Sequence, residues 1–383
     1  MLKVATGWSD DPESTTAVQE ALDMAVSILD GHVPKAALVY AAVDQDLSVI
    51  GTTLRTRYPD ILVAGGTTDG EIAGGEGFLE DSLVIMLFAS DSLEFSVGIG
   101  RNAIAEPAQS TADAVAMARA GSDKDINLGI AMLEGLGTNI HDLVGGLQNA
   151  LGAGVPIVGG AAADQLRFQG TRQICNDIVT SDAVVILTVH GSVKVSVGVA
   201  TGYTPLGQPH LVTKAEGAVV HQIDNRPAAE LYADYLQQPS IFYPLAVQDE
   251  TRHSLVLSSP LNFDAETGAL HLVNPVAQGS VVQLSTASRQ EIIDAARNAV
   301  GQAAAGMKDT PVDAALLFSC AGRRATLGTR IREEYDNVCT IIGQDVPIAG
   351  FYCYGEIGPE KAGGPSLTHT NAFVAVFLSA ATA

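Results

Sequence analysis

Short apolar runs recur along the chain and are bounded by glycine, proline or polar residues. Continuous apolar runs of this length are typical of strands that are covered on both faces of a sheet. They fall into three groups: AALVYAA (36–42), ILVAGGTTDGEIAGG (61–75) and SLVIMLFAS (82–90); NLGIAMLEG (127–135), VPIVGGAAADQ (155–165) and DAVVILTVHG (182–191); AALLFSCAGRR (314–324), VPIAGFYCYGEIGP (346–359) and NAFVAVFLSA (371–380).

The three groups share one order of elements. In each, a strand is followed by a helical stretch, a second strand that ends at glycine, a polar loop and a third strand. A strand, a crossover helix and a second strand form a right-handed parallel βαβ unit, and the shorter connection to the third strand favours antiparallel pairing. We therefore predict an α/β fold with mixed sheets, built from internally repeated βαβ-type units in two halves, with helices covering the sheets. The alternative is an ordinary α/β protein without internal duplication.

Further elements follow from periodicity and turn residues. Apolar spacing of three and four predicts helices over 13–30 and 290–307. Alternating stretches at 93–102 and 192–203 predict strands that form hairpins with the strands preceding them. The segment 205–225 is rich in proline, glycine and polar residues and indicates a boundary. The predicted domains are residues 1–220 and 221–383.

Composition narrows the classes of function. The chain has 383 residues, 47% of them hydrophobic and 17% charged, which is typical of a globular protein. The net charge of −22 makes nucleic acid and anionic membranes unfavourable partners. The sequence shows neither a signal peptide nor a membrane span, so we expect no membrane insertion. Four scattered cysteines without a CxxC motif indicate reduced thiols and a cytoplasmic location.

Strong catalytic motifs are absent from the sequence. It contains no P-loop, no GxGxxG after a strand, no GxSxG elbow and no HExxH. The eight histidines show no zinc-ligand spacing. We therefore expect a binding protein rather than an enzyme.

The last group of strands places a glutamate among glycines, in AGFYCYGEIGP. The carboxyl ends of its two parallel strands are expected at the same edge of the sheet, where α/β proteins bind ligands. That arrangement brings Arg323 or Arg324 close to Glu356. The arginine either pairs with Glu356, as a structural salt bridge, or binds a ligand carboxylate. Tyr352 and Tyr354 would supply rigid walls for a small-molecule pocket.

The equivalent loops of the other groups are also polar. Gly66, Thr67 and Glu71 follow the second strand of the first group, and Asp164 and Gln165 follow that of the second. Cys320 is either a nucleophile activated by a nearby arginine or an inert buried thiol.

The chain resembles the FIST family, a bacterial sensory module with FIST N and FIST C halves. The resemblance rests on GWS at 7–9, VAGGTTDGEI, GYTPLG with VTKAEG and RPAAELY, FSCAGR, GFYCYGEIGP and HTNAF, in that order over most of residues 1–380. It implies ligand sensing, with amino acids proposed as ligands, and output through a separate histidine kinase or cyclic-di-nucleotide enzyme. The residues that the pattern and the resemblance together place around the ligand are Trp8, Gly66, Thr67, Glu71, Cys320, Arg323, Tyr352, Tyr354, Glu356 and His369.

Two other functions stay open from the sequence. Some relatives bind haem and respond to nitric oxide, which makes haem the alternative cofactor and His369 or His190 the candidate axial ligand. An enzyme that uses Cys320, or Glu356 with Arg323, is the third alternative.

Overall fold

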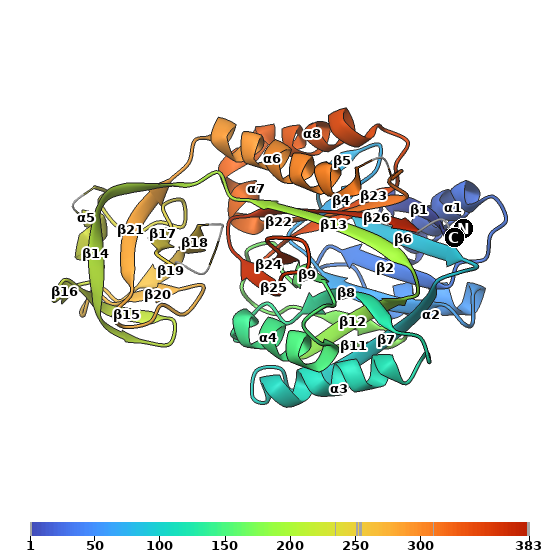
Figure 1. The fold of residues 1–383 in the computed structure, drawn as a ribbon, viewed down its shortest axis with the longest axis horizontal. Helices are drawn as coiled ribbons and strands as arrows, with labels where there is room; N and C mark the ends of the chain where they lie inside the picture. Colours follow the sequence, from blue (N-terminus) through green and yellow to red (C-terminus); the bar gives the residue numbers. More distant parts are fainter. Residues whose placement is uncertain (1, 234, 250–251, 253–254, 309, 381–383) are drawn as a thin grey trace.

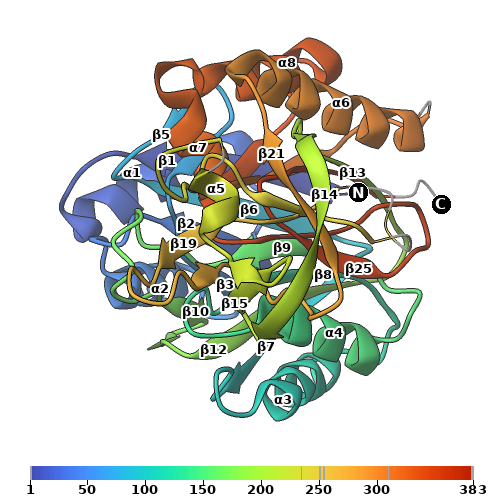
Figure 2. The ribbon, with the colours of Figure 1, turned by 90° about the vertical axis from the view of Figure 1, so that its left-hand side faces the viewer.

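The computed structural model describes residues 2–233, 235–249, 252, 255–308 and 310–380. It shows an α/β core made of three units, and a smaller lobe of strands that projects from one side of the core (Figure 1). Seen from the side of the lobe, the three units lie around a common centre (Figure 2). The predicted mixed α/β class is confirmed.

The first two units follow one another along residues 2–190. The first contains β1 (Leu2–Ser9), α1 (Ser14–Leu29), β2 (Ala36–Ala41), α2 (Leu47–Arg57), β3 (Leu62–Thr67), β4 (Glu71–Ala73), β5 (Gly77–Leu79) and β6 (Leu83–Ser90). The second contains β7 (Glu94–Arg101), α3 (Pro107–Arg119), β8 (Ile126–Leu133), α4 (Ile140–Leu151), β9 (Ile157–Ala161), β10 (Gln173–Cys175), β11 (Ile178–Thr180) and β12 (Ala183–His190).

The third unit is interrupted by the lobe. It contains β13 (Val193–Ala200) and, after the lobe, α6 (Arg289–Met307), β22 (Ala314–Cys320), α7 (Ala321–Leu327), a 3₁₀ turn (Gly328–Arg330), α8 (Arg332–Ile342), β23 (Ile348–Cys353), β24 (Glu356–Pro359), β25 (Ser366–His369) and β26 (Phe373–Ala380). The lobe contains β14 (Thr204–Glu216), β15 (Val219–Ile223), β16 (Arg226–Pro227), α5 (Glu230–Ala233), β17 (Leu245–Val247), β18 (Val256–Ser258), β19 (Pro260–Phe263), β20 (Leu270–Leu272) and β21 (Val281–Thr286).

The three core sheets exchange hairpins in a closed ring. The β4–β5 hairpin of the first unit pairs with β23 of the third, β10–β11 of the second pairs with β3 of the first, and β24–β25 of the third pairs with β9 of the second. Within each unit the two strands joined by helix are parallel, namely β2 with β3, β8 with β9 and β22 with β23. Each unit therefore completes the sheet of a neighbour.

One glycine in each unit fixes how closely its parallel strands approach. A Cβ atom at these glycines would lie 1.8–2.0 Å from a carbonyl oxygen of the neighbouring strand, a clash that no side chain could relieve. The glycines and the carbonyl residues are Gly65 with Val39, Gly159 with Ala131 and Gly350 with Leu317. Only glycine permits this contact, and each lies just before the loop that leaves its sheet for the centre.

The predicted hairpins at 93–102 and 192–203 are wrong. Both stretches are strands, but β7 pairs with β12 and β13 pairs with β26. Each strand opens a new unit and pairs with the last strand of that unit rather than with the strand before it. The domain split at residue 220 stays a prediction. That residue lies inside β15 of the lobe, and β13 belongs to the same sheet as β26.

Candidate functional site

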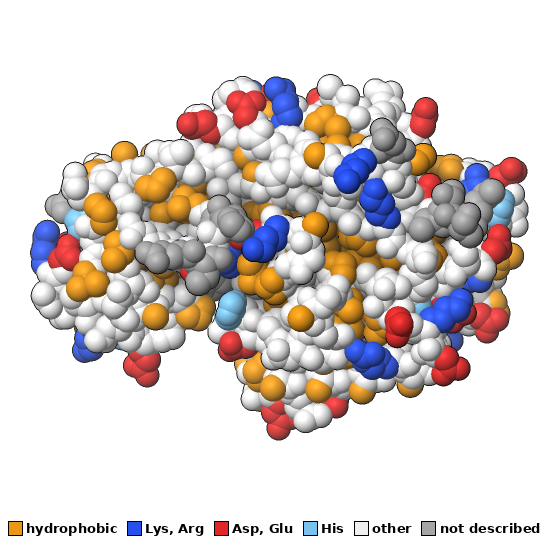
Figure 3. Space-filling model, viewed as in Figure 1, with side chains coloured by type: hydrophobic (Ala, Val, Ile, Leu, Met, Phe, Trp, Pro, Cys, Tyr) orange, Lys and Arg blue, Asp and Glu red, His pale blue; other side chains and the backbone are white. Residues whose placement is uncertain are grey.

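A cavity of about 520 Å³ lies between the core and the lobe. Core residues that line it follow the carboxyl ends of β8, β22 and β23, and the lobe contributes the opposite wall. Figure 3 shows the indentation between the lobe and the core, where hydrophobic side chains reach the surface beside a basic side chain and a histidine. The lining residues are Gly135–Ile140, Leu166, Phe168, Cys320–Gly322, Cys353, Tyr354, Thr370 and Asn371 from the core, with Gly217, Ala218, Ile241, Ser259, Leu261, Leu272, Val273 and Pro275 from the lobe.

Two cysteines lie side by side at the base of this cavity. Cys320 and Cys353 end the parallel strands β22 and β23 and are register partners. Cys353 Sγ lies 3.4 Å from Glu356 Oε1 and 3.4 Å from the carbonyl oxygen of Ser319. Burial raises the pKa of both thiols. At neutral pH both cysteines are therefore protonated and unreactive at rest.

Glu356 is fully buried directly behind these thiols. It is the first residue of β24, and the hairpin exchange holds it opposite Gly160 of β9. Its Oε2 accepts the N–H of Ala372 at 3.0 Å. Burial raises the pKa of Glu356, and that N–H bond offsets only part of the effect. The Glu356 carboxyl therefore loses its proton in a pH range in which ordinary glutamates are already ionised.

The predicted pairing of Glu356 with an arginine is wrong. The Nε of Arg323 donates to Glu334 Oε1 at 2.9 Å, and its Nη1 and Nη2 reach the carbonyl oxygens of Thr201 and Ile292. Arg323 is fully buried and lies outside the cavity lining, so it is a structural residue here. Each of its three guanidinium nitrogens thus donates to a partner within the protein.

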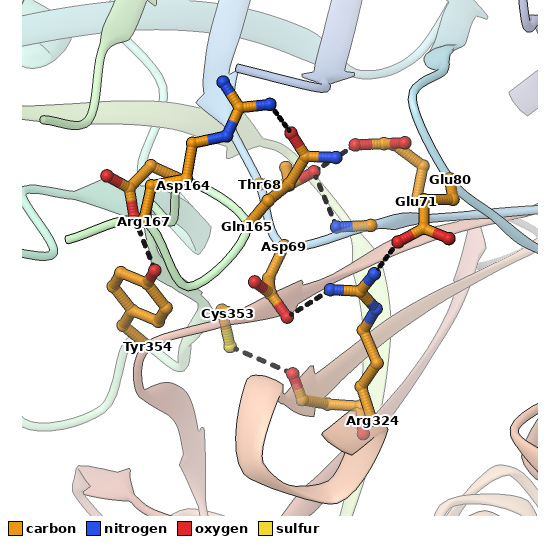
Figure 4. Close-up of polar contacts among 12 residues, drawn as sticks. Thr68, Asp69, Glu71, Glu80, Asp164, Gln165, Arg167, Arg324, Cys353 and Tyr354 are labelled. Carbon is orange, nitrogen blue, oxygen red and sulfur yellow. Dashed lines mark hydrogen bonds and ion pairs between the residues drawn. The ribbon is translucent and has the colours of Figure 1, made fainter. Parts of the chain in front are cut away.

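Arg324 crosses between units to pair with Asp69, at 3.0 Å, and with Glu80 (Figure 4). Burial raises the pKa of Asp69 to about 6 against the lowering effect of this arginine. The arginine thus joins the third unit to the loop after β3 of the first.

Glu71 repeats the environment of Glu356 in the first unit. It begins β4, is fully buried, accepts the Thr68 hydroxyl, and receives the Ser82 hydroxyl at 2.6 Å. Burial raises its pKa to about 7. Thr68 and Cys353 each precede their glutamate by three residues and make the same side-chain contact. Glu71 is not part of the cavity lining.

Tyr354 and a strained loop form another wall of the cavity. The Tyr354 ring stacks on Phe168, with centroids 5.2 Å apart, and its hydroxyl donates to Asp164 (Figure 4). Gln165, Leu166 and Phe168 all have positive φ angles, between 52° and 57°. Such backbone is costly for side chains other than glycine and persists only where the surroundings impose it.

Asp164 holds this strained loop in place. Its carboxylate accepts the backbone N–H groups of Phe168, Gln169 and Gly170 at 2.7–3.0 Å. Burial raises the pKa of Asp164, but the Tyr354 hydroxyl and these N–H groups more than compensate and hold it below its usual range. Asp164 therefore stays charged and accepts these three hydrogen bonds from the loop.

The other residues predicted at the site lie outside this cavity lining. Trp8 packs against the core from β1, Gly66 lies against the backbone of β10, Thr67 Oγ1 accepts the N–H of Arg172, and the Tyr352 hydroxyl donates to Glu334 at 2.7 Å. Sequence reasoning missed Phe168, Asn371 and the whole lobe wall. Isolated apolar residues such as Leu261, which is 49% exposed, give no periodic signal.

Neither candidate histidine fits haem ligation. His369 Nε2 donates to the Gly358 carbonyl at 2.9 Å, and its Nδ1 lies 3.2 Å from Arg252 Nη2. Burial and the Arg252 charge lower the pKa of His369. His190 Nδ1 and Nε2 contact the Lys124 carbonyl and Thr188. With both ring nitrogens engaged, neither imidazole offers iron an open ligand.

The described residues offer neither a membrane-spanning helix nor a metal site of three ligands. None of their helices is long and apolar enough to cross a membrane. In the same part of the chain, no three His, Cys, Asp or Glu side chains gather in a way that could hold a metal ion.

Two uncharacterized mycobacterial proteins and one solved structure are similar to this chain. An uncharacterized protein of Mycobacterium tuberculosis (strain H37Rv) is 29% identical over 239 residues, 59% of this chain and 61% of the relative, so the match spans about three fifths of that relative. An uncharacterized protein of Mycobacterium bovis is 24% identical over 98% of this chain and 99% of its own. The crystal structure of a cyanuric acid hydrolase from A. caulinodans aligns over 100% of both chains, with 10% identity and a TM-score of 0.41.

Two family models cover most of the chain. The FIST N domain matches residues 35–226, and the FIST C domain matches residues 228–359. The chain therefore belongs to the FIST family, whose domains are associated with sensory signal transduction.

Proposed function

We propose that the cavity between core and lobe binds an uncharged, largely apolar small molecule and that binding is the input of a sensor. The observation that carries this proposal is the composition of the lining. The lining comes from both the core and the lobe, and its described residues include no Asp, Glu, Lys or Arg. A free amino acid would have to leave its two charges unpaired there, at high cost. An apolar molecule with one or two hydrogen-bonding groups suits Asn139, Ser259 and Asn371.

The strained loop at 164–170 connects the cavity to the surface and could transmit the effect of ligand binding. Leu166 and Phe168 face the cavity, while Arg167 pairs with Asp44 and Gln165 donates to Asp81 at 2.6 Å. A ligand that favours one arrangement of Phe168 over another therefore changes contacts on the first unit. The proposed output is a separate histidine kinase or cyclic-di-nucleotide enzyme that reads this surface.

The proposed location is the cytoplasm. All four cysteines are free, and two of them are register neighbours that an oxidising compartment would expose to disulfide formation.

A cavity-filling variant tests the proposal. Purified protein is screened by thermal shift against uncharged apolar metabolites, and a hit at 100 times its dissociation constant should stabilise by about 2.7 kcal/mol. Ala218→Trp places a ring in the cavity from the lobe and should abolish the response. Ala265→Trp, on an exposed turn of the same lobe, should preserve it. A ligand that stabilises Ala218→Trp as well as the parent, or silence across the panel, would refute the proposal.

A further inference from the structure

We propose that Cys320 is a covalent attachment site for an uncharged electrophile, an α,β-unsaturated ketone or aldehyde, and that Glu356 takes and returns the thiol proton. The inference rests on the proposed function of the cavity, because that cavity must first hold the electrophile. It makes the sensor responsive to the reactivity of its ligand as well as to its shape.

Access singles out Cys320 among the four free cysteines. It lines the cavity and keeps 6% of its surface exposed there. Cys353 also borders the cavity but is fully buried. Cys175 is buried in the first sheet, and Cys339 lies in a separate surface hollow of α8. The described residues thus provide one thiol that is exposed to the cavity, Cys320, and one surface thiol for comparison, Cys339.

Addition of a thiol to an electrophile needs groups that stabilise the thiolate and a group that accepts its proton. The surroundings of Cys320 supply both. Burial raises the pKa of Cys320, which keeps the resting thiol neutral, while the N–H groups of Gly322 and Asn371 lower it. Those two N–H groups are placed to stabilise a thiolate as it forms. We assign Glu356 as the acceptor for the proton, because its Oε1 lies 3.4 Å from Cys353 Sγ and Cys353 is the register partner of Cys320.

Few ionisable groups surround Glu356. Cys353 faces it from β23, Cys320 from the end of β22 and Arg323 from α7, and His369 is its register partner on β25. His369 is neutral because burial and Arg252 lower its pKa. Glu356 is therefore the carboxylate that we assign to the Cys320 proton.

The reaction is a conjugate addition and needs no other reactant. The Cys320 proton passes to the Glu356 carboxylate, and the sulfur lone pair forms a bond to the β-carbon of the electrophile. The carbon–carbon π pair moves toward the carbonyl to give an enolate. Glu356 then returns the proton to the α-carbon, so that a saturated thioether forms with no leaving group and no change of oxidation state elsewhere.

The cavity lining selects this class of electrophile. Its described residues include no lysine that could form a Schiff base with a carbonyl compound, and no charged side chain that could bind an ionic reagent. Anionic alkylating agents such as iodoacetate should therefore react poorly with Cys320. A neutral apolar enone can bind in the cavity without burying a charge, and it carries an electrophilic carbon.

A matched pair of ketones tests the inference. Benzylideneacetone is the enone, and benzylacetone is its saturated counterpart, which binds without reacting. Full-length protein is incubated with benzylideneacetone and mapped by peptide mass spectrometry over time and concentration. We expect labelling of Cys320 at a rate that saturates with concentration, slowed by benzylacetone. Cys339 should react in proportion to concentration. Cys320→Ser should remove the saturable phase, and Cys339→Ala, in the separate surface hollow, should retain it.

Variants of Glu356 test the proton transfer. Glu356→Gln should lower the maximal labelling rate at least about tenfold without changing the half-saturating concentration. The wild-type rate should rise with pH as Glu356 ionises, and Glu356→Gln should flatten that profile. If Glu356→Gln does not fold, the wild-type profile alone decides, because a profile without this inflection removes Glu356 from the mechanism.

The outcomes separate the two proposals. If benzylacetone binds saturably but benzylideneacetone labels Cys320 no faster than Cys339, the covalent inference is overturned and the binding proposal stands. If neither ketone binds and labelling is linear at every cysteine, both fail for this class of ligand.

Discussion

Arg323 donates to Glu334 in a pair that is almost completely withdrawn from solvent, with side chains 0% and 1% exposed. The carboxylate also accepts the Tyr352 hydroxyl at 2.7 Å and the Ser319 hydroxyl at 3.1 Å. The pair therefore joins α7, α8, β22 and β23 beneath the cavity. Arg323 supports the site from below and does not bind its ligand.

Removing one member of this pair should be severely destabilising. Arg323→Met leaves the Glu334 charge buried without its partner, and we expect a loss of about 3–5 kcal/mol of unfolding free energy. The matched control is Arg330→Met, since the Arg330–Glu333 pair is 34% and 42% exposed and should contribute less than about 1 kcal/mol. Urea denaturation measures both. Equal losses in the two variants would contradict the structural role of Arg323.

Stability should fall as pH rises because of Glu71. Burial raises its folded-state pKa from 4.5 to about 7. Between these values the Glu71 carboxyl binds more protons in the folded state than in the unfolded state. Its contribution to the unfolding free energy is therefore greatest below pH 4.5 and declines as pH rises through 7. The full effect is on the order of 3 kcal/mol. Asp69 and Glu356, whose pKa values burial also raises, contribute in the same direction.

Glu71→Gln isolates that contribution. Glutamine resembles the protonated acid and cannot ionise, so the variant should match the parent near pH 5 and exceed its stability at pH 8. The control Glu266→Gln, on an exposed turn, should keep the parental slope. Denaturation midpoints at several pH values provide the measurement. A variant whose stability changes with pH as steeply as that of the parent would show that Glu71 is not the source.

The sequence predicted what depends on local pattern. The buried runs became strands, and the ends of β22 and β23 meet at Cys320 and Cys353 because consecutive parallel strands of one unit share an edge. The hairpin exchange was not predictable, because β24 pairs with β9 about two hundred residues earlier and no local spacing encodes that partner. The pairing of Arg323 with Glu334 was equally unpredictable. Residues 332–336 include several carboxylates, and the sequence does not show which of them is buried in the fold.

The Tyr354 hydroxyl should stabilise the strained loop. Tyr354→Phe removes its hydrogen bond to the charged Asp164 while retaining the stacked ring. We expect a loss of about 1.5–3 kcal/mol and faster amide exchange at residues 165–170. Tyr235→Phe, at a tyrosine that is 46% exposed, serves as the control and should change neither quantity. Unchanged exchange in Tyr354→Phe would mean that Asp164 holds the loop through its backbone contacts alone.

Arg252 should hold the lobe against the core. Its Nε lies 2.8 Å from Glu360 Oε1, with side chains 10% and 6% exposed, and its Nη2 donates to the Thr368 carbonyl at 3.1 Å. Arg252→Met removes these bonds, so the fraction of molecules in which the lobe is separated from the core should increase. Chymotrypsin cleavage after the buried Tyr203, which lies in the connection between β13 and β14, reports that population when reclosing is fast. We expect cleavage to accelerate about tenfold or more, since 1.4 kcal/mol of docking energy corresponds to that factor.

Arg226→Met, which removes an exposed lobe pair with Glu230, should leave the rate unchanged. Equal cleavage rates in Arg252→Met and the parent would show that the lobe is held by its apolar contacts rather than by Arg252.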